Sequence, residues 1–450
     1  MFKHIPALLK FAGPMILSTS AITLMQIIDA FVLSRYSSEA VAAIGPSGMA
    51  VVLFQGLLFG TAGYAGTFVA HNHGRGDAAG VRSSAWLGIH TALFSGILAL
   101  MAAWPLAQLF HAAGHEPSVA SSESTYFWIC MAGSIFPVLG SALAGWLSGI
   151  GRPAVVTVVT FFSLSINAVL AWGLVLGVWG LPRMGIAGAA LATVAAQFTA
   201  SILYLVMFIR SGGFADHTAR RFSWPEYRHF LGLAAPMGLR ISVELTAWTL
   251  FLVIVGRLGT VELAASSIAF RINGLAFFPA LGLGQAAGVL VGHARGAGHD
   301  DEVPGIAWQS LAVCEIWMLL MAALFATASA PLMSIFSGSG PESGQIVVTG
   351  AVLMKFVAFY CIFDAANVMT GCVLSSVGDT NWVARSFLVC SSVFLLLLWL
   401  VDRSCPGLMA EWSLATAFVL ITAVVWILRF SGGAWRKILV LHSANERNQL

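Results

Sequence analysis

The chain has 450 residues, of which 58% are hydrophobic and 9% are charged, and its mean hydropathy is +0.88. In an ordinary soluble domain about a quarter of the residues are charged, so this composition excludes one. The net charge of +3 says little by itself, because in a membrane protein the placement of charge carries the information. The chain is therefore a polytopic membrane protein, and we expect no nucleic-acid partner.

Twelve apolar runs separate short polar islands, and each run is long enough to cross the hydrocarbon core as a helix. Met1–Lys10 is a basic flank without a convincing cleavage site, so we expect a retained first helix and no signal peptide. The predicted spans are 8–34, 46–70, 84–110, 125–149, 154–177, 185–209, 230–256, 264–292, 306–336, 346–375, 383–401 and 410–430.

The placement of Lys and Arg predicts the orientation in the membrane. If the N-terminus is cytoplasmic, fifteen basic residues lie inside and only four outside. The positive-inside rule then places both termini in the cytoplasm, which requires an even number of crossings. Twelve spans satisfy this requirement.

The sequence repeats itself. When the chain is laid on itself with a shift of 222 residues, identical residues meet across two spans and the loop between them, and LSGIG at Leu147 meets LSSVG at Leu374 with a shift of 227. Six spans separate the copies, so the halves form a parallel repeat, with a substrate route expected between two six-helix lobes. The matched pairs include Pro14 and Pro236, Arg35 and Arg257, Gly60 and Gly282, His71 and His293, and Gly76 and Gly298.

This repeat predicts the domain organisation. We expect an N-terminal lobe of six spans at 1–210, a cytoplasmic interlobe linker at 211–229, a C-terminal lobe of six spans at 230–430 and a cytoplasmic tail at 431–450. The six cysteines form no C-x-x-C pair and are expected to be small packing residues. There is no G-x-x-x-x-G-K-[ST] motif, so transport would have to run on an ion gradient.

Four acids lie at membrane depth in the predicted spans: Asp29, Glu244, Glu315 and Asp364. A lone acid at membrane depth is costly and marks an ion or proton pathway. The repeat counterparts of three of them are not acidic, because Asp29 meets Phe251, Glu244 meets Ile22 and Asp364 meets Pro137. Acids carried by one lobe only are what a coupling site needs. The alternative for Asp29 is the cap of a polar cluster or a buried ion pair.

Polar residues near these acids extend the candidate sites. Ser163 and Asn167 are four residues apart in one span and can face the same cavity as Asp29, or can simply link helices. Tyr360 and Asn367 share one helix face with Asp364, which suits a hard cation such as sodium or a network of hydrogen bonds between helices.

Two arginines at membrane depth are candidate charge partners. Arg240 stands one helical turn before Glu244, so the two could form a structural salt bridge. Arg271 could neutralise an acid of the C-terminal lobe or bind an anion, or its long side chain could reach the membrane interface.

Two parallel six-helix halves, with Pro14 and Asp29 fifteen residues apart in the first span, resemble the multidrug and toxic compound extrusion (MATE) family. The similarity covers nearly the whole chain. The local markers are IIDAFVLSRYSSEAVAAIG in span 1, GIAGAALATVAAQ after span 5, VGRLGTVELAASSIAFRI joining spans 7 and 8, and LSSVGDT after span 10.

The resemblance implies an all-α integral membrane protein of the MATE/MOP-type fold that expels organic, often cationic, compounds in exchange for sodium ions or protons. Asp29 matches the N-lobe acid of the family, Asn167 matches an Asn/Asp position, and Ser163 stands where many members have Asn. Glu244, Asp364 and Tyr360 match the C-lobe cation site of the NorM-like branch.

Two residues depart from that branch. Arg240 could occupy the charge of Glu244, and Arg271 brings the chain closer to members whose coupling is assigned to the N-lobe acid.

The predicted mechanism is alternating access by the two lobes. Asp29 would hold a cationic substrate and release it when a proton or sodium ion arrives, and Pro14 would allow span 1 to bend. We expect a monomeric antiporter in a bacterial inner membrane, without a cofactor or a metal beyond sodium.

Two other functions remain open at this point. The first is a flippase for lipid-linked oligosaccharides, for which Arg240 and Arg271 would supply a cationic cavity. The second is a membrane-embedded transferase, for which only the loop from His299 to Glu302 offers a His/acid cluster.

Overall fold

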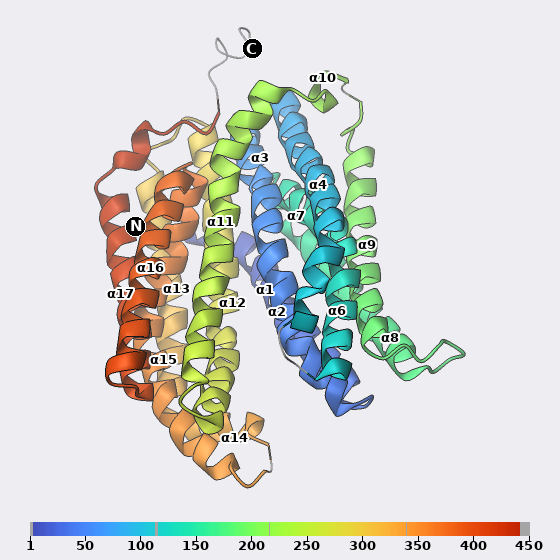
Figure 1. The fold of residues 1–450 in the computed structure, drawn as a ribbon. Coiled ribbons are helices and arrows are strands. Elements are labelled where there is room, and N and C mark those ends of the chain that lie inside the picture. Colours follow the sequence, from blue (N-terminus) through green and yellow to red (C-terminus); the bar gives the residue numbers. More distant parts are fainter. Residues whose placement is uncertain (1–2, 113–115, 216, 339, 442–450) are drawn as a thin grey trace. The chain divides into compact units, whose positions relative to one another are not determined.

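A computed structural model describes residues 3–112, 116–215, 217–338 and 340–441. Every regular element in these ranges is helical, and Figure 1 shows long helices running side by side within each part of the chain. Part of the predicted tail, 442–450 with Arg447, lies outside the described residues.

The helices coincide with the predicted spans, and four of the spans consist of two helices each: α2 with α3, α4 with α5, α6 with α7, and α13 with α14. Their bounds are α1 (Ile5–Ser34), α2 (Ser38–Gly63), α3 (Ala65–Gly74), α4 (Ala78–Ala107), α5 (Leu109–Ala112), α6 (Pro117–Ala132), α7 (Ile135–Gly149), α8 (Pro153–Leu176), α9 (Ile186–Arg210), α10 (His217–Arg220), α11 (Trp224–Val255), α12 (Thr260–Gly296), α13 (Val303–Thr327), α14 (Ser329–Phe336), α15 (Ser343–Ser376), α16 (Thr380–Ser404) and α17 (Leu408–Ser431), followed by a short 3-10 helix, Ala434–Lys437.

Within the described ranges, ten helical segments are long and apolar enough to cross a membrane, and the pair α6–α7, bent by 46°, adds an eleventh when it is counted as one span. The 30 residues of α1 fill the remaining predicted run, and Pro14 lies inside this helix without ending it.

The helix bounds extend the repeat beyond the identical residues. Adding 222 to the range covered by α2 and α3, which runs from Ser38 to Gly74, gives 260–296, the bounds of α12. Adding 227 to the start of α8, Pro153, gives 380, where α16 begins. The duplicated scaffold therefore includes spans whose side chains have diverged.

The described chain divides into two compact units. Unit 1 contains the described residues up to Ile16, Val243–Arg295 and His299–Val440, and unit 2 contains Leu17–Ser242 and Gly296–Gly298. The divisions fall inside α1, just after Pro14, and inside α11, after Pro236. The predicted lobe bounds and the linker at 211–229 stay a prediction.

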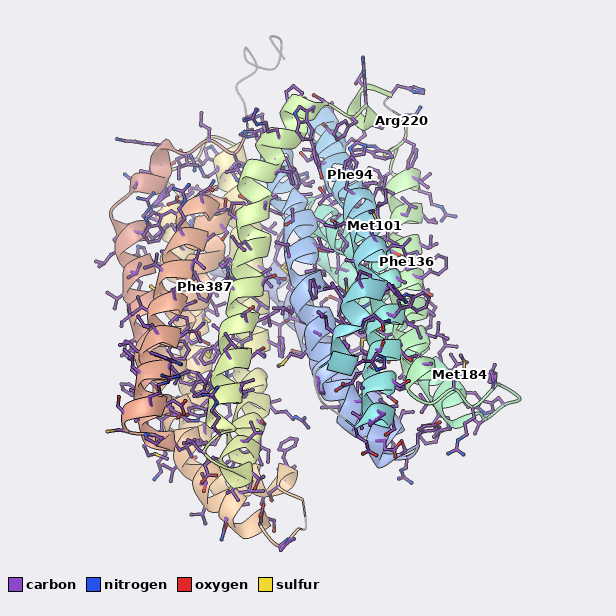
Figure 2. All side chains as sticks on the ribbon, in the orientation of Figure 1. Phe94, Met101, Phe136, Met184, Arg220 and Phe387 are labelled. Atoms are coloured by element: carbon purple, nitrogen blue, oxygen red, sulfur yellow. The ribbon has the colours of Figure 1, made fainter. Side chains whose placement is uncertain are left out.

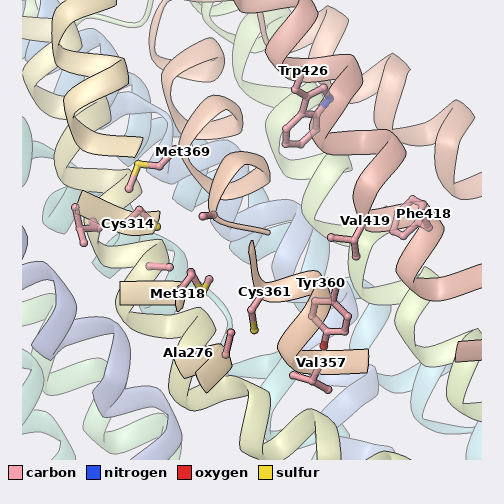
Figure 3. Packing of buried hydrophobic residues seen from close by; sticks show 14 of the residues in the cluster. Ala276, Cys314, Met318, Val357, Tyr360, Cys361, Met369, Phe418, Val419 and Trp426 are labelled. Carbon is pink, nitrogen blue, oxygen red and sulfur yellow. The ribbon is translucent and has the colours of Figure 1, made fainter. Parts of the chain in front are cut away.

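The core of unit 1 contains a group of packed aromatic rings. Phe251 packs against Trp412 with ring centroids 5.7 Å apart, and the indole of Trp412 donates to the Ser266 hydroxyl over 3.1 Å. Figure 3 shows another part of this core, where Cys314 and Cys361 lie among apolar side chains. The cysteines are free, and these two are buried, as expected of packing residues.

Unit 2 relies on glycine for close helix packing. A Cβ added to Gly66 of α3 would lie 2.8 Å from the carbonyl oxygen of Gly145 in α7, and one added to Gly149 would lie 2.8 Å from the carbonyl oxygen of Gly66. These distances leave no space for a methyl group, so the two backbones approach directly. The contact fixes α7 against α3.

We predict that Gly66→Ala destabilises the protein by about 1–3 kcal/mol, because the added methyl group forces two backbones apart. The matched control is Gly232→Ala in α11, where a Cβ would meet nothing within 4 Å. That change should be neutral or stabilising by up to about 1 kcal/mol, since alanine favours a helix. Thermal unfolding in detergent measures both variants, and equal midpoints would contradict the packing argument.

Candidate functional site

The first candidate site lies in unit 2, where three helices place polar side chains around Asp29. Asp29 of α1 is 7% exposed, and Asn167 of α8 is fully buried. The Asn167 side chain lies within hydrogen-bonding reach of the Asp29 carboxyl, and its Nδ2 donates to Thr193 Oγ1 of α9 over 3.3 Å. The predicted proximity of Asp29 and Asn167 is therefore present in the structure.

Two oxygens of this cluster are unsatisfied. Oδ1 of Asp29 and Oδ1 of Asn167 are buried without a hydrogen-bond partner among the described residues. An unpaired carboxylate out of water costs several kcal/mol, so the site favours a proton, a small cation or a cationic ligand at this carboxyl. Carboxyl and amide oxygens are also the ligands that a hard cation prefers.

Helix α6 closes the cluster with residues that the sequence analysis did not include. Tyr126 and Cys130 are buried, lie four residues apart on one face, and interact electrostatically with Asp29. Gln55 of α2 donates from Nε2 to the Cys130 carbonyl over 3.3 Å and to Ser134 Oγ over 2.9 Å. The only sequence signal was the presence of isolated polar residues in apolar helices.

Ser163 has a different surrounding from Asn167. Its hydroxyl donates to the carbonyl oxygen of Ala196 over 2.7 Å and so links α8 to α9. This contact matches the alternative that the sequence left open, a polar link between helices. A part for Ser163 in coupling stays a prediction.

The second candidate site lies in unit 1 around Asp364 of α15. The Glu244 carboxyl of α11 acts on Asp364 electrostatically, and the Asn367 side chain lies within hydrogen-bonding reach of it. Asn367 Nδ2 also donates to the Val419 carbonyl over 2.9 Å, while its Oδ1 is buried without a partner in the described part of the chain. Two acids and an amide therefore meet here.

Tyr360 lies on the same face of α15 as Asp364 but is more deeply buried than Asp364. It is 3% exposed and lies beside Val357 and Cys361 in the apolar cluster of Figure 3, close enough to Asp364 to interact with it. The thiol of Cys361 in turn donates to Asn273 Oδ1 over 3.7 Å. The predicted set of Glu244, Asp364 and Tyr360 is thus brought together, and its role in coupling stays a prediction.

The arginines and Glu315 lie as follows. Arg240 and Glu244 are both half-buried on α11, and Glu315 is half-buried on α13. Arg271 is exposed on α12 and forms no ion pair with a described residue. The roles of Arg240 and Arg271 as charge partners stay predictions.

Two buried acids were missed. Glu123 in α6 and Glu411 in the first turn of α17 are both 0% exposed. Glu123 precedes the predicted start of its span, 125–149, and Glu411 is the second residue of the predicted span 410–430, so neither is expected at membrane depth. Both carboxyl oxygens of Glu411 lack a described partner, and nearby Asp402 is held by Arg257 over 2.9 Å.

Two acids of the His/acid loop after α12 form ion pairs with basic residues. Asp300 accepts from Arg295 over 3.1 Å, and Glu302 accepts from Lys3 over 2.8 Å, a hydrogen bond that lowers the pKa of Glu302. Among the described residues, no three His, Cys, Asp or Glu side chains could hold one metal ion. The contacts of this loop favour a structural turn over the catalytic cluster of a transferase.

Comparisons with known proteins agree with this arrangement. The MatE family model matches residues 14–173 and 236–400, one stretch in each repeat. The chain is 28% identical to a probable multidrug resistance protein NorM of Agrobacterium fabrum, over 86% of this chain and 84% of that protein. It is 26% identical to a protein of the same description from Thermotoga maritima, over 96% of this chain and 94% of that protein.

Solved structures show the same fold. A MOP superfamily transporter from Pyrococcus furiosus, described as having a binding pocket of reverse polarity, superposes with a TM-score of 0.85 at 18% identity and covers 96% of each chain. An outward-facing MATE transporter superposes with a TM-score of 0.84 at 18% identity, again over 96% of each chain.

These similarities confirm the predicted all-α integral membrane fold of the MATE/MOP type, and they confirm a transporter as opposed to an enzyme. The two matched stretches together cover well over half of the chain and include Asp29, Asn167, Glu244 and Asp364. The protein therefore belongs to the MatE family of membrane transporters.

Proposed function

We propose that this protein exports organic, amphipathic cations across a membrane in exchange for protons or sodium ions, and that Asp29 is the residue at which the two compete. The observation that carries the proposal is the buried Asp29 carboxyl, whose Oδ1 has no partner among the described residues and lies beside Asn167. The names of the curated relatives, probable multidrug resistance proteins, support export of drug-like compounds.

Competition follows from the surroundings of this carboxyl. In a buried site one negative charge can be neutralised by a proton, by a sodium ion or by a cationic substrate, but not by two of them without leaving an uncompensated positive charge. Arrival of the coupling ion would therefore release the substrate, and loss of the ion would prepare the site for the next one.

Alternating access needs elements that respond to the charge state of Asp29. Helix α1 is the natural candidate, because its residues up to Ile16 pack in unit 1 and its residues from Leu17, with Asp29, pack in unit 2. Pro14 interrupts the backbone hydrogen bonds of α1 close to this division. Bending at this position would link neutralisation of Asp29 to a rearrangement of the units.

We favour export of cations over an oligosaccharide flippase. The flippase hypothesis depended on Arg240 and Arg271 supplying a cationic cavity, and Arg271 is exposed. The clusters described in the membrane-spanning helices are built around the acids Asp29, Glu244 and Asp364. We further propose a bacterial inner membrane location with both termini in the cytoplasm, a monomeric protein, and no cofactor other than the coupling ion.

We predict that Asp29→Asn lowers ion-driven dye efflux at least tenfold, because the amide cannot exchange a proton or hold a cation. The matched control is Glu315→Gln, an acid within α13 that lies outside both clusters, which should keep more than half of the activity. Efflux of a fluorescent cationic dye from cells with equal surface expression measures both variants. Intact efflux with unchanged ion dependence in Asp29→Asn would refute the proposal.

Dye uptake under a single imposed ion gradient distinguishes which of the two acid clusters couples transport to the ion. In inverted vesicles given either a proton or a sodium gradient, we expect Asp29→Asn to lose ion-dependent dye uptake and Asp364→Asn to retain it. The physical reason is that Asp364 shares its site with Glu244, so one acid remains there after the substitution. The reverse pattern would move the coupling site to unit 1.

A further inference from the structure

An exposed aromatic cluster covers one end of unit 2, outside both candidate sites. It consists of Phe94 of α4, Phe222 just before α11, and Trp224 and Tyr227 in the first turn of α11. The Tyr227 ring lies 5.2 Å from Phe222, 5.6 Å from Phe94 and 6.2 Å from Trp224, centroid to centroid. The Phe222 and Phe94 rings are 5.7 Å apart. Four rings therefore pack as one group around a buried tyrosine.

Three of the four rings face outward. Trp224 is 60% exposed, Phe94 is 50% exposed and Phe222 is 40% exposed, whereas Tyr227 is 5% exposed. Exposed aromatic side chains that form a contiguous patch mark an interaction surface. Trp and Tyr have a polar edge on an apolar body, so they favour the boundary between water and hydrocarbon.

Arginines adjoin the aromatic cluster along the chain, because Arg221 precedes Phe222 and Arg228 follows Tyr227. Arg210, Arg221 and Arg228 are exposed, and none of them forms an ion pair with a residue in the described ranges. Arg220 contacts the ring of His217 within α10. The acids between 210 and 229 are Asp216 and Glu226, so arginines are in excess and their charge is available to an anion.

Exposed apolar side chains continue from the cluster along α4. Along α4 beyond Phe94, Ile97 is 59% exposed and Met101 is 73% exposed. Met101 lies about 10 Å further along the helix than Phe94, at 1.5 Å per residue. Figure 2 shows Arg220, Phe94 and Met101 following one another in this order within unit 2. The surface thus passes from basic to aromatic to apolar.

We infer that this surface binds the headgroups of anionic phospholipids. The three layers match one leaflet of a bilayer, in which phosphates lie outermost, the interfacial region follows and acyl chains lie innermost. Arginine pairs well with phosphate, and its charge near an anionic surface favours binding. Helix α4 is apolar enough to cross a membrane, and Ile97 and Met101 are exposed on it, so a lipid whose acyl chains cover these side chains is the occupant continuous with the surface.

The inference concerns residues that take no part in the proposed transport site, so it stands or falls independently of Asp29. It assigns a role to the segment between α9 and α11, which joins the two halves of the repeat. The same arginines that the positive-inside rule counted would act locally, at a bound headgroup, as well as in setting the orientation.

Titration of the purified full-length chain in detergent with phosphatidylglycerol or phosphatidylcholine, followed by native mass spectrometry, tests this. The probe variant is Arg221→Gln/Arg228→Gln. The matched control is Arg75→Gln/Arg152→Gln, two exposed arginines of the same unit that are distant in sequence from the aromatic cluster. Each arginine near an anionic surface is worth about fivefold in affinity, so we expect the probe variant to bind phosphatidylglycerol at least tenfold more weakly. The control variant should change less than threefold.

A second measurement locates the lipid. Nanodiscs would be made with lipids that carry bromine on the upper part of the acyl chain. Trp224→Phe should reduce the quenching of tryptophan fluorescence. This reduction should be larger in brominated phosphatidylglycerol than in brominated phosphatidylcholine. Equal weakening in the two arginine pairs, equal affinity for the two lipids, or no contribution of Trp224 to quenching would each overturn the inference.

Discussion

Burial of the Asp29 carboxyl beside Asn167 is the interaction on which the proposed mechanism depends. The helices that surround it supply a tyrosine, a threonine and a cysteine but no arginine or lysine among the described contacts. A buried carboxylate without a cation is unfavourable in free energy, and the protein supplies the negative charge without a positive partner. The coupling ion and the cationic substrate supply this positive charge alternately, so Asp29 can couple the binding of one to the release of the other.

Helices α1 and α11 can transmit a change in the charge of Asp29 from one compact unit to the other. Each begins in the compact unit formed mainly by the opposite half of the sequence, and each carries a proline shortly before it enters the other unit. The arrangement repeats because the scaffold is duplicated, with Pro14 matching Pro236. The acid is not duplicated, since Phe251 occupies the position that matches Asp29 and packs in the aromatic core of unit 1. The same scaffold position therefore holds a charged side chain in the N-terminal half and a packed aromatic ring in the C-terminal half.

Most of the fold could be predicted from the sequence because a bilayer requires long apolar helices, whose lengths and spacing are visible directly. The pairing of Asp29 with Asn167 could be predicted too, since few polar residues occur at that depth. Tyr126, Cys130 and Thr193 could not, because residues of these types are common in apolar helices, and only the folded protein shows that they lie near Asp29 or Asn167. Glu411 was missed for another reason: the span boundary was placed one residue before it, and burial at a helix end depends on neighbouring helices.

Counting the ions released when substrate binds tests the central claim most directly. A cationic dye would be titrated into purified protein in weakly buffered solution, with a pH indicator and a sodium-selective electrode recording release. The account predicts that about one proton or one sodium ion leaves for each dye molecule bound, and that the release disappears in Asp29→Asn. Dye binding without release of either ion, or release that persists in Asp29→Asn, would contradict it.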